Sequence, residues 1–181
     1  MVLLLALASA PQARAGPVPY ALDSRYATIE FTTSGLLGMQ GYFPHFTGHL
    51  TLDFQNPENS MVNVSVDDSA ITMSVPLAVS TLRSAAYFDA ARFPAVTFRS
   101  LTITVLTPTR FKIHGALTIR GLTRMQDMDA LLVSAPAAGT ADFLISGMLR
   151  RSDFGMVADR DLVDDAVGLN IHARVELQKN P

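Results

Sequence analysis

The sequence predicts an all-β fold in which about eight antiparallel strands and one short helix form a single domain. Apolar and polar residues alternate with a period of two along most of the 181-residue chain. This alternation is typical of strands that bury one face and expose the other. Turn sequences rich in Pro, Asn and Ser separate the alternating segments. A chain of this length supports one domain with a sizeable core.

The segment from 167 to 177 shows the clearest alternation, with apolar residues at every odd position and polar residues at most of the even ones. Segments 111–119 and 46–54 follow the same rule, and shorter stretches repeat it. Hairpin connections are expected at Asn56–Ser60 and Thr107–Thr109. Helical spacing is confined to Ser80–Ala91, and Pro94 ends that stretch.

One short helix is too small to cover a sheet of this extent, so the sheet must cover itself as a sandwich or as a closed barrel. A closed barrel also removes the exposed edges that such an apolar sheet would otherwise present. A barrel of about eight strands either fills with side chains or keeps room for one ligand. Composition alone leaves both of these interiors open.

The amino-terminal segment predicts export. A short apolar run from Val2 to Ala8 is followed by Ala13-Arg14-Ala15, which fits cleavage after Ala15. We therefore expect residues 1–15 to be a signal peptide and residues 16–181 to be the mature domain. The run is shorter than the roughly 20 residues that a membrane-spanning helix needs, so the protein is not expected to span a membrane.

Composition excludes several classes of partner and chemistry. A net charge of −2 argues against a nucleic-acid partner. The absence of cysteine excludes disulfides, thiolate nucleophiles and cysteine-ligated metals. All four histidines are expected on the polar faces of strands, so we predict neither catalytic residues nor metal ligands. We expect two local ion pairs, Arg83 with Asp89 and Arg151 with Asp153, because buried charges need partners.

Five motifs in order resemble the YceI-like family. The most specific is the segment 82–94, Leu-Arg-Ser-Ala-Ala-Tyr-Phe-Asp-Ala-Ala-Arg-Phe-Pro, which Val96-Thr97-Phe98 follows. The other four are Tyr20-Ala21-Leu22-Asp23, Gly41-Tyr42-Phe43-Pro44-His45-Phe46-Thr47-Gly48, the segment 115–123 from Gly-Ala-Leu-Thr-Ile to Arg-Gly-Leu-Thr, and Arg151-Ser152-Asp153-Phe154-Gly155. The resemblance extends from Tyr20 to Lys179, which is nearly the whole mature chain.

The resemblance implies a lipocalin-like periplasmic barrel, often a homodimer, whose apolar tunnel holds a polyisoprenoid chain such as an isoprenoid quinone tail. No covalent cofactor is implied; the expected ligand is an isoprenoid quinone or another polyprenyl lipid, held for transport, storage or sensing. Strand alternation and the family motifs together give the predicted ligand-binding residues: Phe31, Phe43, Phe46, Leu82, Tyr87, Phe88, Phe98, Leu117, Ile119, Phe143, Phe154 and Ile171.

Two departures from the family pattern concern the polar end of the ligand. Segment 31–35 lacks the histidine that family members often carry before the second strand, and segment 76–81 is uncharged where the family commonly has charged residues. The resemblance therefore predicts binding of the tail but not the way in which a head group is held. Two alternatives stay open: a filled barrel with a structural or interaction role, and an enzyme that acts on an amphiphile.

Overall fold

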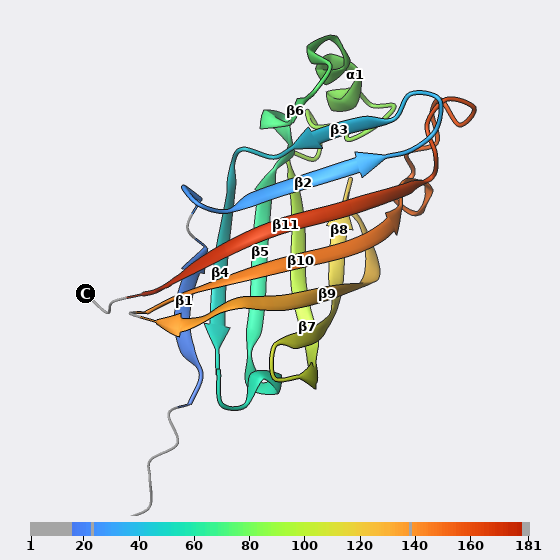
Figure 1. The fold of residues 1–181 in the computed structure, drawn as a ribbon. Coiled ribbons are helices and arrows are strands. Elements are labelled where there is room, and N and C mark those ends of the chain that lie inside the picture. The colour runs from blue at the N-terminus through green and yellow to red at the C-terminus, as the bar shows by residue number, and fades with distance from the viewer. Residues whose placement is uncertain (1–15, 23, 138, 179–181) are drawn as a thin grey trace, which may run out of the picture.

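The computed structural model describes residues 16–22, 24–137 and 139–178, and the predicted signal peptide lies outside these described residues. The chain is an all-β barrel with one short helix (Figure 1), as the alternation predicts. The strands are β1 (Val18–Leu22), β2 (Thr28–Thr33), β3 (Met39–Tyr42), β4 (Phe46–Leu52), β5 (Met61–Asp67), β6 (Thr72–Met73), β7 (Ala95–Thr107), β8 (Arg110–Ile119), β9 (Leu122–Ala137), β10 (Thr140–Arg150) and β11 (Ala166–Leu177).

The sheet closes on itself because β1 pairs with β4 on one side and with β11 on the other. The closed order is β1-β4-β5-β7-β8-β9-β10-β11, in which every neighbouring pair is antiparallel. Strands β2, β3 and β6 continue the wall from β11, since β2 pairs with the first half of β11 and β1 with the second half. Of the two expected architectures, the structure therefore has the barrel and not the sandwich.

The two ends of the barrel are built differently. At one end, here called the capped end, lie the helix α1 (Val79–Arg83), the 3₁₀ helices η2 (Asp68–Ala70), η3 (Pro76–Ala78) and η4 (Arg151–Phe154), and the β8–β9 turn (Figure 1). At the other, the hairpin end, lie the 3₁₀ helix η1 (Pro57–Asn59) and the β7–β8 turn.

Arg120 joins the loops of the capped end. This residue lies in the β8–β9 turn, and its guanidinium donates to the carbonyl oxygens of Gly155 at 2.7 Å and Ala85 at 3.0 Å. The turn, the η4 loop and the loop after α1 are therefore held to one another by a single side chain.

The helix is shorter than the sequence predicts. It ends at Arg83 because Ser84 is extended, and the Ser84 hydroxyl donates to the carbonyl of Thr81 at 2.7 Å. The chain beyond it folds as turns around Asp89, whose φ is 51°. Serine and aspartate compete with helical hydrogen bonds in this way, which the helical spacing of the apolar residues does not reveal.

Candidate functional site: an apolar cavity inside the barrel

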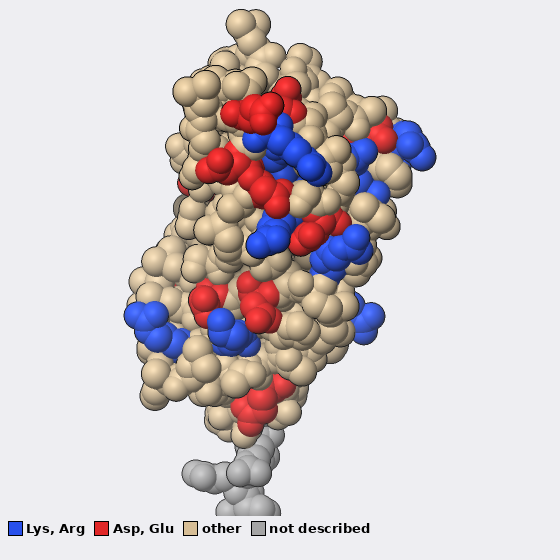
Figure 2. Space-filling view, turned by 90° about the vertical axis from the view of Figure 1, so that its right-hand side faces the viewer, with Lys and Arg blue, Asp and Glu red and all other residues tan. Residues whose placement is uncertain are grey.

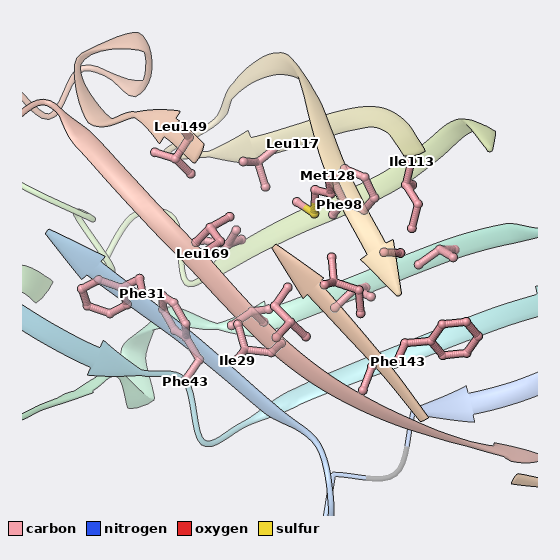
Figure 3. Close-up of a pocket in the computed structure, with 18 of the residues that line it drawn as sticks. Ile29, Phe31, Phe43, Phe98, Ile113, Leu117, Met128, Phe143, Leu149 and Leu169 are labelled. Carbon is pink, nitrogen blue, oxygen red and sulfur yellow. The ribbon is translucent and has the colours of Figure 1, made fainter. Parts of the chain in front are cut away.

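The barrel encloses an apolar cavity of about 250 Å³ (Figure 3). Its lining runs from Leu82, Tyr87 and Phe88 at the capped end to Pro57 and Pro108 at the hairpin end. An apolar cavity of about 150 Å³ suffices to bind benzene in another protein. The interior is therefore hollow rather than filled with side chains.

Exposure along the strands supports the same conclusion. Phe98, Ile113 and Phe143 face the interior from within the long strands β7, β8 and β10, yet each is only half-buried (Figure 3). Inward side chains of a filled barrel would be fully buried, as Ala141 is near the start of β10. The free surface of the inward side chains is consequently surface that a ligand could cover.

A carboxylate lies in the cavity wall at the hairpin end. Asp53 follows the last residue of β4 and is 5% exposed. Its side chain accepts hydrogen bonds from the backbone N–H groups of Asn56 and Gln55, both at 2.9 Å. These bonds, that from Asn56 above all, hold the pKa of Asp53 below its usual value. The sequence pattern predicted Asp53 on the polar face, but the strand ends before it and the turn directs it inward.

A cation lies in the wall near the capped end. Arg151 begins η4 and is 3% exposed, and its guanidinium donates to four backbone carbonyl oxygens rather than to Asp153, so the predicted pair is wrong. The predicted pair of Arg83 with Asp89 is wrong as well. Arg83 donates to the carbonyl of Ile71, and Asp89 contacts Arg92 at 3.5 Å.

Tyr87 covers the cavity beside this cation. Its ring centroid lies 5.9 Å from the guanidinium carbon of Arg151, and its hydroxyl donates to Asp159 at 2.7 Å. Burial, together with this hydrogen bond to a carboxylate, raises the pKa of Tyr87 to about 12. The phenol therefore stays neutral at physiological pH and acts as a fixed hydrogen-bond donor.

Ten of the twelve predicted ligand-binding residues line this one cavity. The remaining two, Phe46 and Phe154, are buried in the core around it and do not belong to its lining. Those that line the cavity are Phe31, Phe43, Leu82, Tyr87, Phe88, Phe98, Leu117, Ile119, Phe143 and Ile171.

The lining residues that β9 contributes were not predicted from the sequence. Met128, Ala130 and Leu132 point inward from this strand. Their outward neighbours Leu131 and Val133 are also apolar, so period-two alternation gives no signal there. The inward positions of β9 could have been inferred from its pairing with β8, because the two strands form a hairpin whose register is set by the Arg120–Gly121 turn.

On the face shown in Figure 2, charged side chains of both signs are interspersed. Lys112 on β8 and Asp129 on β9 form an ion pair, with their charged atoms 2.8 Å apart. The histidines lie on outward faces, as the alternation predicts. Within residues 16–22, 24–137 and 139–178, no three metal-ligating side chains come together. No helix in the same ranges has the length and hydropathy needed to cross a membrane.

Comparisons with known proteins agree with this geometry. A family model, the YceI-like domain, matches residues 20–175. A UPF0312 protein of Enterobacter sp. (strain 638) is 29% identical, and the match covers 87% of this chain and 85% of the relative.

Two solved structures share the fold. The crystal structure of Burkholderia cenocepacia BcnA has a TM-score of 0.78 at 20% identity, and the match covers 84% of this chain and 98% of that one. A polyisoprenoid-binding domain from Saccharophagus degradans, implicated in plant cell wall breakdown, has a TM-score of 0.67 at 12% identity, and the match covers 89% of this chain and 99% of that one.

Proposed function

Since this chain belongs to the YceI-like family, we propose that it is a periplasmic protein that binds a polyisoprenoid chain inside its barrel. The observation that carries the proposal is the hollow interior, lined almost throughout by apolar side chains between the two ends of the barrel. The polyisoprenoid-binding domain with the same fold supports the choice of ligand. Carriage, storage and sensing of the lipid are the roles that such binding serves.

Burial of the chain supplies the affinity. Each buried methylene contributes about 0.8 kcal/mol, so one five-carbon isoprene unit contributes roughly 4 kcal/mol before costs. Association costs on the order of 4–15 kcal/mol. A few units inside the cavity are therefore sufficient for binding without any covalent or metal contact, and the protein acts as a binding protein rather than an enzyme.

The first experiment is native mass spectrometry of the protein purified from its own host, followed by organic extraction. A bound mass that is released as a quinone or prenol would establish the ligand. A clean unliganded mass, together with failure to take up quinones or prenols in solution, would leave the barrel as an interaction module. The same measurement tests the homodimer, which stays a prediction, as does cleavage after Ala15.

Two pairs of variants locate the bound chain. Val64→Trp narrows the cavity from β5, and the matched control Asn63→Trp places the same side chain on the exposed face of that strand. Leu117→Glu puts a charge in the lining, whereas Ala116→Glu puts it on the opposite face of β8. The inward variant of each pair should lose the lipid while the outward one retains it. Equal retention within both pairs would contradict binding in the cavity.

A further inference from the structure

Arg151 places a positive charge in an otherwise apolar part of the cavity wall. The guanidinium donates to the carbonyl oxygens of Ala158 at 2.6 Å, Val163 at 2.9 Å, and Met156 and Asp164 at 3.1 Å each. These bonds occupy four of its five N–H donors, and one hydrogen on Nη2 is left over. The side chain lines the cavity although the residue is 3% exposed.

Most N–H groups of Arg151 are hydrogen-bonded, but within the part of the chain that the structure describes its positive charge has no carboxylate in direct contact. Its four acceptors are neutral, and among the described residues no carboxylate comes within 4.0 Å of the guanidinium. Carboxylates act on it only from farther away. Asp159 accepts the hydroxyl hydrogen of Tyr87, and, although burial opposes the shift, the pKa of Asp165 is lowered by hydrogen bonds from Ser152 and, to a smaller extent, by the charges of Arg150 and Arg151. A buried cation with no carboxylate in direct contact is costly, so an anion placed beside it in the cavity would be stabilised.

The other end of the cavity has the opposite charge. Asp53 stays ionised because backbone hydrogen bonds lower its pKa, and it lies in the wall at the hairpin end. An anionic group would be repelled there and attracted to Arg151. The two ends of the cavity thus carry opposite charges, a cation near the capped end and a carboxylate near the hairpin end, and the lining between them is mostly apolar.

The surroundings of Arg151 also limit the charge of the ligand. Four carbonyl oxygens already crowd the guanidinium, and their partial negative charges oppose any group that brings more than one negative charge. One free N–H hydrogen suits a single acceptor oxygen. The site therefore fits a small monoanion better than a phosphate or a diphosphate.

From this arrangement we propose that the cavity selects amphiphiles that end in a carboxylate. The carboxylate lies against Arg151, and the apolar chain extends toward Asp53. This proposal rests on the proposed function and deepens it, because it names the polar end of the ligand that the family resemblance leaves open.

The test compares three ligands with one C20 prenyl chain: geranylgeranoic acid, geranylgeraniol and geranylgeranyl phosphate. Binding to the delipidated wild-type protein is measured by isothermal titration calorimetry at pH 7.5. A hydrogen bond between charged groups contributes about 1.5–3 kcal/mol, so the acid should bind about 10- to 100-fold more tightly than the alcohol. The phosphate should bind more weakly than the acid.

Equal affinity for acid and alcohol, or tighter binding of the phosphate, would overturn the proposal while leaving lipid binding intact. Binding of none of the three would instead contradict the proposed function. Arg151→Gln should lower the ratio of acid affinity to alcohol affinity toward one, and Arg151→Lys should retain part of the preference for the acid. A preference unchanged in Arg151→Gln would refute this location.

A second measurement needs no variant, because Arg151 also holds the η4 loop and its replacement could unfold the protein. The pH titration of carboxyl-¹³C-labelled geranylgeranoic acid bound to wild-type protein reports the ionisation of the head group by NMR. Contact with Arg151 should keep the bound carboxylate ionised to lower pH than in detergent micelles. A carboxyl that titrates at higher pH than in micelles would place it away from the cation and overturn the proposal.

Discussion

Replacing Asp68 with asparagine should stabilise the protein at neutral pH. Asp68 opens η2 at the capped end, and the residue is fully buried at 0% exposure. Both of its carboxylate oxygens lack a hydrogen-bond partner among the described residues. Burial, with a smaller contribution from the neighbouring charge of Asp67, raises the pKa of Asp68 from 3.8 to about 6.

The direction of the pH dependence follows from linkage. Between pH 3.8 and about 6 the folded state binds more protons at Asp68 than the unfolded state does, so the free energy of unfolding falls as pH rises through this window. The loss is nearly complete at pH 7.5, well above the folded-state pKa. At 1.36 kcal/mol for each pH unit, the shift corresponds to about 3 kcal/mol. The asparagine amide is also unpaired there, at a cost of about 1 kcal/mol or more, which leaves an expected gain of no more than about 2 kcal/mol.

Urea unfolding at pH 7.5 and pH 4.0 measures this effect. Asp68→Asn should raise the free energy of unfolding at pH 7.5 and change it little at pH 4.0, where the wild-type carboxyl is protonated in the folded state. Asp67→Asn is the matched control. Asp67 accepts hydrogen bonds from the backbone and the hydroxyl of Ser69, which lower its pKa, so this variant should destabilise. A gain at Asp68 of equal size at both pH values would refute the electrostatic reasoning.

Two further substitutions test packing and hydrogen bonding at the capped end. Gly41→Ala should lower the free energy of unfolding by about 1–3 kcal/mol through overpacking, because its Cβ would collide with the ring of Phe31. Gly147→Ala, whose Cβ would have its nearest contact at 3.4 Å, should be tolerated. Thermal unfolding of the two variants distinguishes these outcomes. Tyr87→Phe removes the hydroxyl that donates to Asp159 and should cost about 1–3 kcal/mol. Chemical unfolding measures that cost, and an unchanged stability would show that the bond contributes nothing.

Strand alternation predicted which faces of the strands point inward, and these faces form most of the cavity lining. Inward positions such as Phe98, Leu117 and Ile171 follow from period two alone, because one face of each strand is apolar and the other polar. The pattern predicts which side chains face inward. It does not predict whether they meet in the middle, so the hollow interior had to come from the structure.

The polar members of the site could not be predicted from the sequence. Asp53 continues the alternation of β4 as an outward residue, and only the turn that follows directs it inward. Arg151 has an acidic residue two positions away, yet its partners are carbonyl groups from the loop before β11. Sequence spacing does not reveal hydrogen bonds to backbone atoms, since any residue type supplies a carbonyl oxygen.

The pairing of β1 with β11 has a consequence for how the protein is made. Tyr20 lies opposite Leu177, so the seam of the barrel joins the beginning of the domain to its end. Until β11 has been synthesised, β1 and β10 of the nascent chain are open edges with an apolar face, and such edges pair with other chains. Synthesis and closure are therefore sequential, and a chain truncated before residue 166 should aggregate rather than fold as a smaller barrel.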